Sequence, residues 1–225
     1  MKKVVLMDIE GTTTNIDFVH SVLFPYSHEQ MGDFISSYQH DTDIQAQLKE
    51  AASDLGLTTT HDPEAIATEL RRWIAEDRKH PVLKYIQGKI WKSGYRKGAF
   101  KGHIYPDVLS AWQKWQNEGW ILAIYSSGSV EAQKLLFQHS VHGDIRQFIS
   151  HHFDTKVGPK RESASYARIT EELDTDPEKI LFLSDVPDEL AAAKAAGLAV
   201  LHIRRQGTPE APNYPSAANF SEVDL

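Results

Sequence analysis

The sequence predicts an α/β fold: a doubly wound, Rossmann-like parallel sheet that carries an inserted all-helical unit. An apolar run at residues 3–8 fits a buried strand, and after Gly102 short apolar strands alternate with helices. Between residues 17 and 96 the periodicity is helical and no convincing strand is evident. We therefore expect a core domain formed by residues 1–15 and 100–225, with a helical domain of residues 16–99 inserted after the first strand.

The individual elements follow from the spacing of apolar residues and from turn and cap signals. Asp62 before Pro63 is typical of a helix cap followed by the first helical residue. Strands are expected at residues 3–8, 120–125, near Phe148, at 180–183 and at 199–203. Helices are expected at residues 18–24, 29–38, 44–55, 63–75, 81–90, 107–118, 130–138, 162–172 and 187–196.

Two segments have the composition of connections. Residues 92–102 are rich in glycine and basic side chains, which favours a flexible crossing between two units, with an ordinary surface loop as the alternative. Residues 207–225 contain several prolines and predict a loosely packed extension.

Composition excludes several classes of function. The chain has 225 residues and a net charge of -7, which argues against binding a nucleic-acid backbone. It contains no cysteine, which removes disulfides, thiolate nucleophiles and zinc-thiolate sites. The apolar run after Lys3 is too short for a signal sequence or a membrane span. We expect a cytoplasmic monomer with no nucleic-acid or membrane partner.

The first strand ends in Asp8 and Glu10, followed by Gly11 and three threonines. Alternation along a strand directs the two carboxylates to the same side of the chain. They lie at the carboxyl end, where open α/β sheets bind ligands, and glycine with hydroxyl residues is expected to leave backbone N–H groups free for an anion. This pattern indicates a divalent metal and a phosphate. The alternative is that the acids only form a turn or cap a helix.

Three later strand ends carry polar residues of complementary chemistry. Ser126 and Ser127 follow one strand at the start of a helix, where hydroxyls either help to bind an anion or merely cap the helix. Lys160 precedes another helix and is better placed than Lys156 to bind an anion. Asp185 follows a third strand and fits a magnesium ligand. For Asp188 and Glu189 a role in the site and simple complementation of the helix dipole remain equally open.

An acid pair, a hydroxyl, a lysine and a late acid, each at a strand end and in this order, resemble the haloacid dehalogenase superfamily of phosphatases. The resemblance implies that Asp8 attacks phosphorus and that Ser126 and Lys160 hold the phosphoryl oxygens. It also implies a Mg²⁺ site made by Asp8, Asp185 and the backbone carbonyl of Glu10. Most phosphatases of the superfamily have aspartate where this chain has Glu10. The longer side chain is expected to keep the role of acid and base while its reach changes.

Longer strings sharpen the resemblance. Residues 8–13, 125–133 and 153–163 closely resemble the enolase-phosphatase family of methionine salvage, also called acireductone synthases, and with residues 103–107 the likeness spans almost the whole chain. It implies a bifunctional enzyme with a helical cap over its site. The enzyme would convert 2,3-diketo-5-methylthiopentyl-1-phosphate to the enediol phosphate, and then to acireductone and phosphate. Ser126, Ser127 and Lys160 are expected to contact this substrate.

Two other functions remain as alternatives. One is a generic Mg-dependent small-molecule phosphatase with the same core. The other is a catalytically silent phosphate-binding module, against which the intact acids and Lys160 argue. Within the inserted domain, His20, Phe24 and Tyr26 either pack in a core, which is the safer interpretation, or line a pocket for the methylthio end.

Overall fold

The chain forms two compact units. The computed structural model describes residues 3–38, 40–54 and 62–225. One unit comprises Met1–Ile16 and Lys101–Leu225, and the other comprises Asp17–Phe100. These boundaries differ by one residue from those expected from the sequence. That the helical unit acts as a cap over the site stays a prediction.

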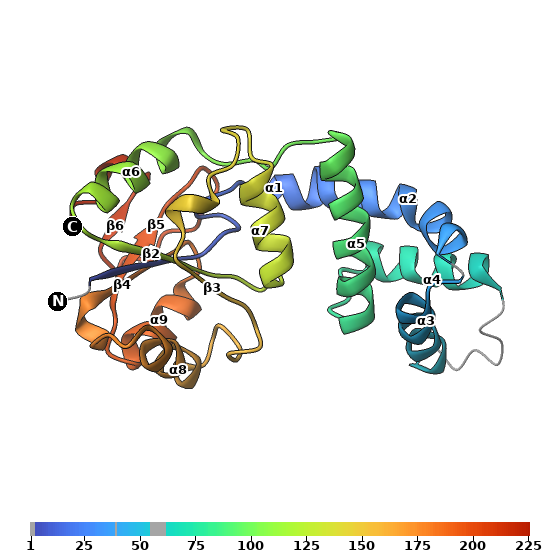
Figure 1. Ribbon diagram of the computed structural model, residues 1–225. Coiled ribbons are helices and arrows are strands. Elements are labelled where there is room, and N and C mark those ends of the chain that lie inside the picture. The colour runs from blue at the N-terminus through green and yellow to red at the C-terminus, as the bar shows by residue number, and fades with distance from the viewer. Residues whose placement is uncertain (1–2, 39, 55–61) are drawn as a thin grey trace. The chain divides into compact units, whose positions relative to one another are not determined.

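The first unit is built on a six-stranded sheet in the order β3-β2-β1-β4-β5-β6, in which every pairing between neighbours is parallel (Figure 1). The strands are β1 (Val4–Met7), β2 (Ile121–Tyr125), β3 (His151–Phe153), β4 (Ile180–Ser184), β5 (Ala199–Ile203) and β6 (Ser216–Ala217). The predicted doubly wound α/β class is confirmed. Chain order reverses between β1 and β4, so ligands are expected outside the carboxyl ends of these two strands.

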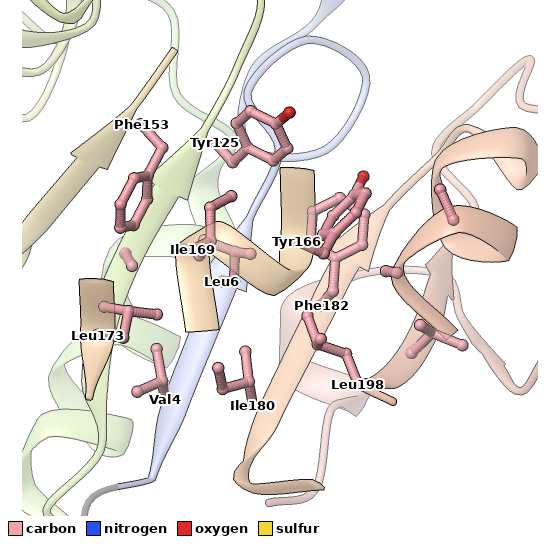
Figure 2. Packing of buried hydrophobic residues seen from close by; sticks show 14 of the residues in the cluster. Val4, Leu6, Tyr125, Phe153, Tyr166, Ile169, Leu173, Ile180, Phe182 and Leu198 are labelled. Carbon is pink, nitrogen blue, oxygen red and sulfur yellow. The ribbon is translucent and has the colours of Figure 1, made fainter. Parts of the chain in front are cut away.

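The helices of this unit are α6 (Pro106–Asn117), α7 (Val130–Gln138), α8 (Ser163–Leu173) and α9 (Pro187–Ala195). Strand side chains alternate between the two faces of the sheet. Leu6, Tyr166 and Phe182 belong to a buried cluster on the face that α8 and α9 cover (Figure 2). On the other face, Trp112 of α6 donates from Nε1 to Met7 Sδ at 3.1 Å. The two buried layers fix the direction of β1 and therefore the place where it ends.

The second unit contains helices only, apart from loops, among its described residues. Its elements are α1 (Ile16–Phe18), which begins one residue before it, a π-helical stretch (Val19–Leu23), α2 (Phe24–Ser37), α3 (Thr42–Asp54), α4 (Pro63–Ala75) and α5 (Pro81–Lys97). Its core includes Met31, Leu70 and Trp73. Asp62 caps α4, as predicted, by accepting hydrogen bonds from the N–H groups of Glu64 and Ala65. None of the described helices combines the length and hydrophobicity needed to cross a bilayer.

Several predicted elements differ from the structure. The stretch expected to hold helices 18–24 and 29–38 is continuous from Ile16 to Ser37. The strand expected near Phe148 is present but begins three residues later, at His151, after a 3-10 turn at Arg146–Phe148, and Ser150 N–H reaches the Leu122 carbonyl at 2.9 Å. The end expected for one helix, Leu55, lies outside the described residues.

The predicted flexible crossing is largely helical. The helix that begins at Pro81 runs on to Lys97 and ends at Gly98, whose φ of 69° suits glycine. Glycines and basic residues in 92–102 are typical of loops, but here residues 92–97 belong to the last turns of this helix. Gly94 is instead a packing position, where a Cβ would lie 2.7 Å from the rings of Tyr26 and Phe100.

The carboxyl-terminal segment packs against the sheet, so the expectation of a loosely packed extension was wrong. Residues 216–217 form β6 beside β5. Phe220 is 1% exposed and Val223 is 2% exposed, and the Phe220 ring lies 5.4 Å from that of Trp115. Prolines in this segment shape turns, while two apolar side chains anchor it.

His152, in the edge strand β3, is predicted to make stability depend on pH. Burial, with smaller effects of Lys134 and His151, lowers the pKa of His152 to about 4 from 6.5. As pH falls from about 6.5 to about 4, the unfolded chain takes up a proton that the folded chain refuses, so stability falls across this window. Urea unfolding at pH 7 and pH 5 should show a larger loss for the native chain than for His152→Asn. Equal losses would contradict this.

Candidate active site

The Asp8 carboxylate lies directly beyond β1, at the reversal of chain order. Its Oδ1 accepts the backbone N–H of Ile9 at 2.7 Å and contacts Lys160 Nζ at 2.5 Å. Asp8 is 3% exposed, and its own N–H donates to the Leu183 carbonyl at 2.9 Å. A buried, oriented carboxylate with a cation against one oxygen is suited to act as a nucleophile or a metal ligand.

Glu10 and Ser126 meet through their side chains. The Ser126 hydroxyl donates to Glu10 Oε2 at 3.0 Å and accepts the Gly128 N–H at 3.0 Å. Burial, reinforced by the negative charge of Asp8, raises the pKa of Glu10, while Lys160 opposes the rise. The structure thus brings the predicted acid and the predicted hydroxyl together across β1 and β2.

Asp185 follows β4 and lies against the turn after Asp8. Asp185 Oδ1 accepts a hydrogen bond from Thr12 Oγ1 at 3.2 Å, and the Asp185 N–H donates to Thr12 Oγ1 at 3.1 Å. A Cβ on Gly11 would lie 2.2 Å from Asp185 Oδ2, and Gly11 has φ 75°. Only glycine therefore fits here. Burial, and then the charge of Asp8, raise the pKa of Asp185 to about 6.

The turn after Glu10 does not form the predicted anion cradle. Gly11 N–H donates to the Thr14 carbonyl, and the N–H groups of Thr12, Thr13 and Thr14 all donate to the Ile9 carbonyl. These donors are used because the chain closes into a tight turn on Ile9. The Thr12 hydroxyl donates to Asp185, and the Thr13 hydroxyl donates to the Ile9 carbonyl. The Thr14 hydroxyl donates to the His103 carbonyl. Their role is to hold the turn and Asp185.

At the start of α7, the serine that caps the helix is Ser129, and neither Ser126 nor Ser127 is the N-cap residue. Ser129 caps the helix by accepting the Ala132 N–H at 3.2 Å, and Asp154 Oδ2 accepts the Val130 N–H at 3.2 Å. Ser126 bonds to Glu10 instead, as described above. Ser127, the next residue, is exposed.

Lys160 joins the site from the loop after β3. Its side chain is 9% exposed and contacts Asp8 and also Glu189 Oε2, at 2.7 Å. Burial alone would lower the pKa of Lys160, but the two carboxylates raise it above its ordinary value. The competing Lys156 is exposed.

Glu189 belongs to the site, which the sequence had left open. It is 8% exposed and accepts the Ser184 hydroxyl at 3.1 Å as well as Lys160. Burial, and then the charge of Asp8, raise its pKa. Asp188, by contrast, is exposed and lies 3.6 Å from Arg161. No spacing signal separates the two acids, because Asp188 and Glu189 lie three and four residues after Asp185, which itself precedes α9.

The loop that carries Lys160 is held by side chains that donate to four consecutive backbone carbonyls. The pairs are Arg168 Nη1 to Val157, Tyr125 Oη to Gly158 at 2.9 Å, Ser165 Oγ to Pro159 at 2.7 Å and Tyr166 Oη to Lys160 at 2.8 Å. Gly158 has φ 139°, and a Cβ there would lie 2.2 Å from Ser165 Oγ. These contacts restrict the backbone of the loop, and they therefore fix the position of the Lys160 Cα.

Tyr166→Phe tests whether this support matters for the reaction. Loss of the hydroxyl leaves the Lys160 carbonyl without this donor, and we expect a loss of about 1 kcal/mol in stability. We also expect kcat to fall by roughly tenfold, because small displacements of a positioned cation are costly. The exposed Tyr38 provides the control Tyr38→Phe. Loss of stability with unchanged kcat would show that the hydroxyl serves folding alone.

The predicted pocket residues of the helical unit separate in the structure. His20 and Phe24 line a hollow of about 350 Å³ together with Pro25, His28 and Ile74. Tyr26 packs edge-on against Phe100, with ring centroids 5.0 Å apart. A larger hollow of about 700 Å³ lies near the amino end of β4, beside Thr170 and Lys179, and none of the acids described above lines it.

The charges and the donor set at the site fit a divalent cation. Asp8, Glu10, Asp185 and Glu189 surround Lys160, so acids outnumber the ammonium. Within the described residues no three His, Asp or Glu side chains form a ready-made metal cluster. Magnesium needs no such cluster, because it takes one or two carboxylates and completes its octahedron with water and phosphate oxygens. Asp8 and Asp185 therefore match the number of carboxylates that such a site requires.

The fold and this arrangement of acids and lysine define a class of hydrolase. The family model described as "Hydrolase: haloacid dehalogenase-like hydrolase" matches residues 2–197, and the chain belongs to that family. Enolase-phosphatase E1 of Marinobacter nauticus is 46% identical, with 100% of this chain and 97% of that protein covered. Enolase-phosphatase E1 of a Picosynechococcus species is 47% identical, with 99% and 98% covered. Within the hydrolases, the chain is thus a member of the enolase-phosphatase group.

A solved structure agrees with this assignment. The UTR4 protein of Saccharomyces cerevisiae superposes with a TM-score of 0.83 at 31% identity, covering 99% of this chain and 100% of that one. Since the likeness spans both units, the helical insertion is shared with that protein.

Proposed function

We propose that this chain is a magnesium-dependent enolase-phosphatase that uses Asp8 as its nucleophile. The substrate would be 2,3-diketo-5-methylthiopentyl-1-phosphate, and the products acireductone and phosphate. The observation that carries the proposal is the Asp8 carboxylate held between Lys160 and the Ile9 N–H, with Glu10 beside it. The family of the chain supports the choice of substrate.

Phosphoryl transfer would proceed in two displacements. An Asp8 oxygen attacks phosphorus, the bond from phosphorus to the substrate oxygen breaks, and Glu10 gives its proton to that oxygen. The raised pKa of Glu10 supports a proton there at the start. Glu10 then takes a proton from water, whose oxygen attacks the phosphorus of the aspartyl-phosphate. Phosphate leaves, and the Asp8 carboxylate is restored.

The other residues would bind and orient the phosphate. Lys160 offsets the repulsion between the phosphate and Asp8, and Ser126 and Ser127 contact phosphoryl or neighbouring substrate oxygens. Ser126 would exchange its bond to Glu10 for one to substrate, which frees Glu10 for proton transfer. Asp8, Asp185 and the Glu10 carbonyl would hold Mg²⁺, which supplies positive charge to the phosphate and to the enolising oxygens.

The test compares the diketo phosphate with a simple alkyl phosphate monoester. We expect absorbance of the enediol to appear with the diketo phosphate, phosphate to follow it, and both signals to vanish with a chelator and return with Mg²⁺. Equal phosphate release from both compounds without enediol absorbance would favour a generic phosphatase. Binding of phosphate without any turnover would indicate a silent binding module, and either result would overturn the proposal.

We further propose that the enzyme works as a cytoplasmic monomer on small phosphorylated diketones. In support, this one chain itself supplies Lys160 and Glu189 near Asp8. Light scattering of the purified protein would test the oligomeric state.

A further inference from the structure

We propose that Arg205 is a positioning residue for the turn that carries the nucleophile, and that the carboxyl-terminal segment 216–223 holds Arg205 in place. Arg205 touches no predicted substrate or metal ligand through its own side chain. It acts through the backbone carbonyl of Thr12. The inference rests on the proposed function in one respect, the assignment of Asp8 as the attacking group.

Two N–H groups of Arg205 converge on one carbonyl oxygen. Nε donates to the Thr12 oxygen at 3.1 Å, and Nη2 donates to it at 2.9 Å. Thr12 lies in the turn closed on the Ile9 carbonyl, four residues after Asp8. The Thr12 hydroxyl donates to Asp185, so fixing Thr12 fixes that acid as well.

The guanidinium is held on its remaining sides. Nη1 donates to Asp107 Oδ1 at 2.9 Å, and Asp107 Oδ2 accepts the Phe220 N–H at 2.7 Å. The Arg205 carbon Cζ lies 4.0 Å from the Tyr105 ring centroid and 5.2 Å from that of Phe220. With its charge paired and two rings beside it, the side chain is buried to 7% exposure.

The segment 103–107 also holds the turn that follows Asp8. The Tyr105 N–H donates to the Thr13 carbonyl at 3.1 Å, and His103 Nδ1 accepts the Asn15 N–H at 3.0 Å. Residues 103–107 and Arg205 thus contact the turn directly, and Phe220 contacts Arg205 and Asp107 behind them. Arg205 and Phe220 lie beyond residues 2–197, which the family model matches.

A buried arginine with these contacts does more than fill space. The planar fork donates to Thr12 and to Asp107 at the same time, whereas a lysine ammonium is a compact donor on a flexible stem. Replacing arginine with lysine keeps the charge and removes the geometry. A purely electrostatic or space-filling role predicts that lysine suffices, and a positioning role predicts that it does not.

The first experiment compares Arg205→Lys and Arg205→Met with the control Arg146→Met, which removes a surface arginine paired with Asp144. We expect both Arg205 variants to lose roughly 10- to 100-fold in kcat, as expected for a displaced reacting group. KM and inhibition by inorganic phosphate should change less than kcat, because Lys160 and Ser126, which would bind the phosphate, lie outside the hydrogen bonds of Arg205. The control should match the native enzyme.

The second readout does not depend on activity. Hydrogen exchange of the Thr12, Thr13 and Thr14 amides, which bond to Ile9, should be faster in Arg205→Lys and unchanged in Arg146→Met. Phe220→Leu provides a milder variant in case the Arg205 variants do not fold. It removes the ring beside Arg205 and keeps the N–H that bonds to Asp107. We expect it to lower kcat and speed the exchange of the same amides, by less than the Arg205 variants would.

These outcomes separate the two claims. Native-like kcat and native-like exchange in a folded Arg205→Lys would overturn the inference and leave the proposed function intact. A native chain without phosphatase activity would overturn the proposed function, while faster exchange in the variants would still support the structural role of Arg205.

Discussion

Replacing Asp8 with asparagine is expected to lower phosphate release by a factor of about 10⁴ or more, which is the scale seen when a nucleophile is removed. The amide oxygen of asparagine is a poor nucleophile, so no aspartyl-phosphate forms. The fold should persist, because the amide has the same size and its oxygen can still accept the Ile9 N–H.

The measurement is phosphate release at saturating substrate, with thermal unfolding recorded in parallel. Asp144→Asn serves as the matched control, since Asp144 is a half-exposed surface acid paired with Arg146 at 2.6 Å. The control should keep the native rate. An Asp8→Asn protein that is folded and retains more than about a tenth of the native rate would exclude Asp8 as the nucleophile.

Glu10→Gln is expected to lower turnover of the diketo phosphate, whose leaving oxygen takes up a proton, by about 10²- to 10⁴-fold, since the amide can neither give nor take the required proton. The loss should depend on the leaving group. An aryl phosphate whose phenolate leaves without a proton should still phosphorylate Asp8, but water would then attack slowly.

The resulting signature is a burst. Rapid mixing of Glu10→Gln with nitrophenyl phosphate should release about one nitrophenolate per enzyme, followed by a much slower steady rate. Glu210→Gln, a change at an exposed acid of the same unit, should behave like the native enzyme. Equal losses on both substrates, with no burst, would argue that Glu10 only shapes the site.

The parts of the site that were predictable are those fixed by strand ends. Each strand of a parallel sheet brings its carboxyl end to the same edge, so Asp8, Ser126 and Asp185 had to gather once their strands were located. Lys160 follows the same rule through β3. The order of residue types along the chain then predicted the class of chemistry.

The remaining features depend on contacts that the local sequence does not specify. The N–H groups of the Gly11–Thr14 turn are used internally because the turn closes on Ile9, and a list of residues does not reveal which donors stay free. Glu189 was ambiguous because an acid in the first turn of a helix also suits the dipole. Its selection required knowing that Lys160 lies within 2.7 Å.

The support provided by the carboxyl-terminal segment was the least predictable feature. Its prolines suggested weak packing, yet Phe220 reaches both Trp115 and Arg205. Trp115 and Phe220 are separated by about half the chain, and Arg205 and Phe220 by a long loop. The spacing of apolar residues along the sequence does not predict contacts between residues so far apart. That Arg205 is buried beside two aromatic rings, and so could position the turn, is evident only once the fold is known.

The most direct test of the account follows the configuration at phosphorus. A phosphorothioate analogue of the substrate, made chiral at phosphorus with one oxygen isotope and hydrolysed in water of a third isotope, gives a chiral thiophosphate whose configuration reports how many displacements occur. Transfer to Asp8 followed by attack of water involves two inversions, so the thiophosphate product should show overall retention. Overall inversion would mean that water attacks the substrate directly, and would contradict the role of Asp8 as nucleophile.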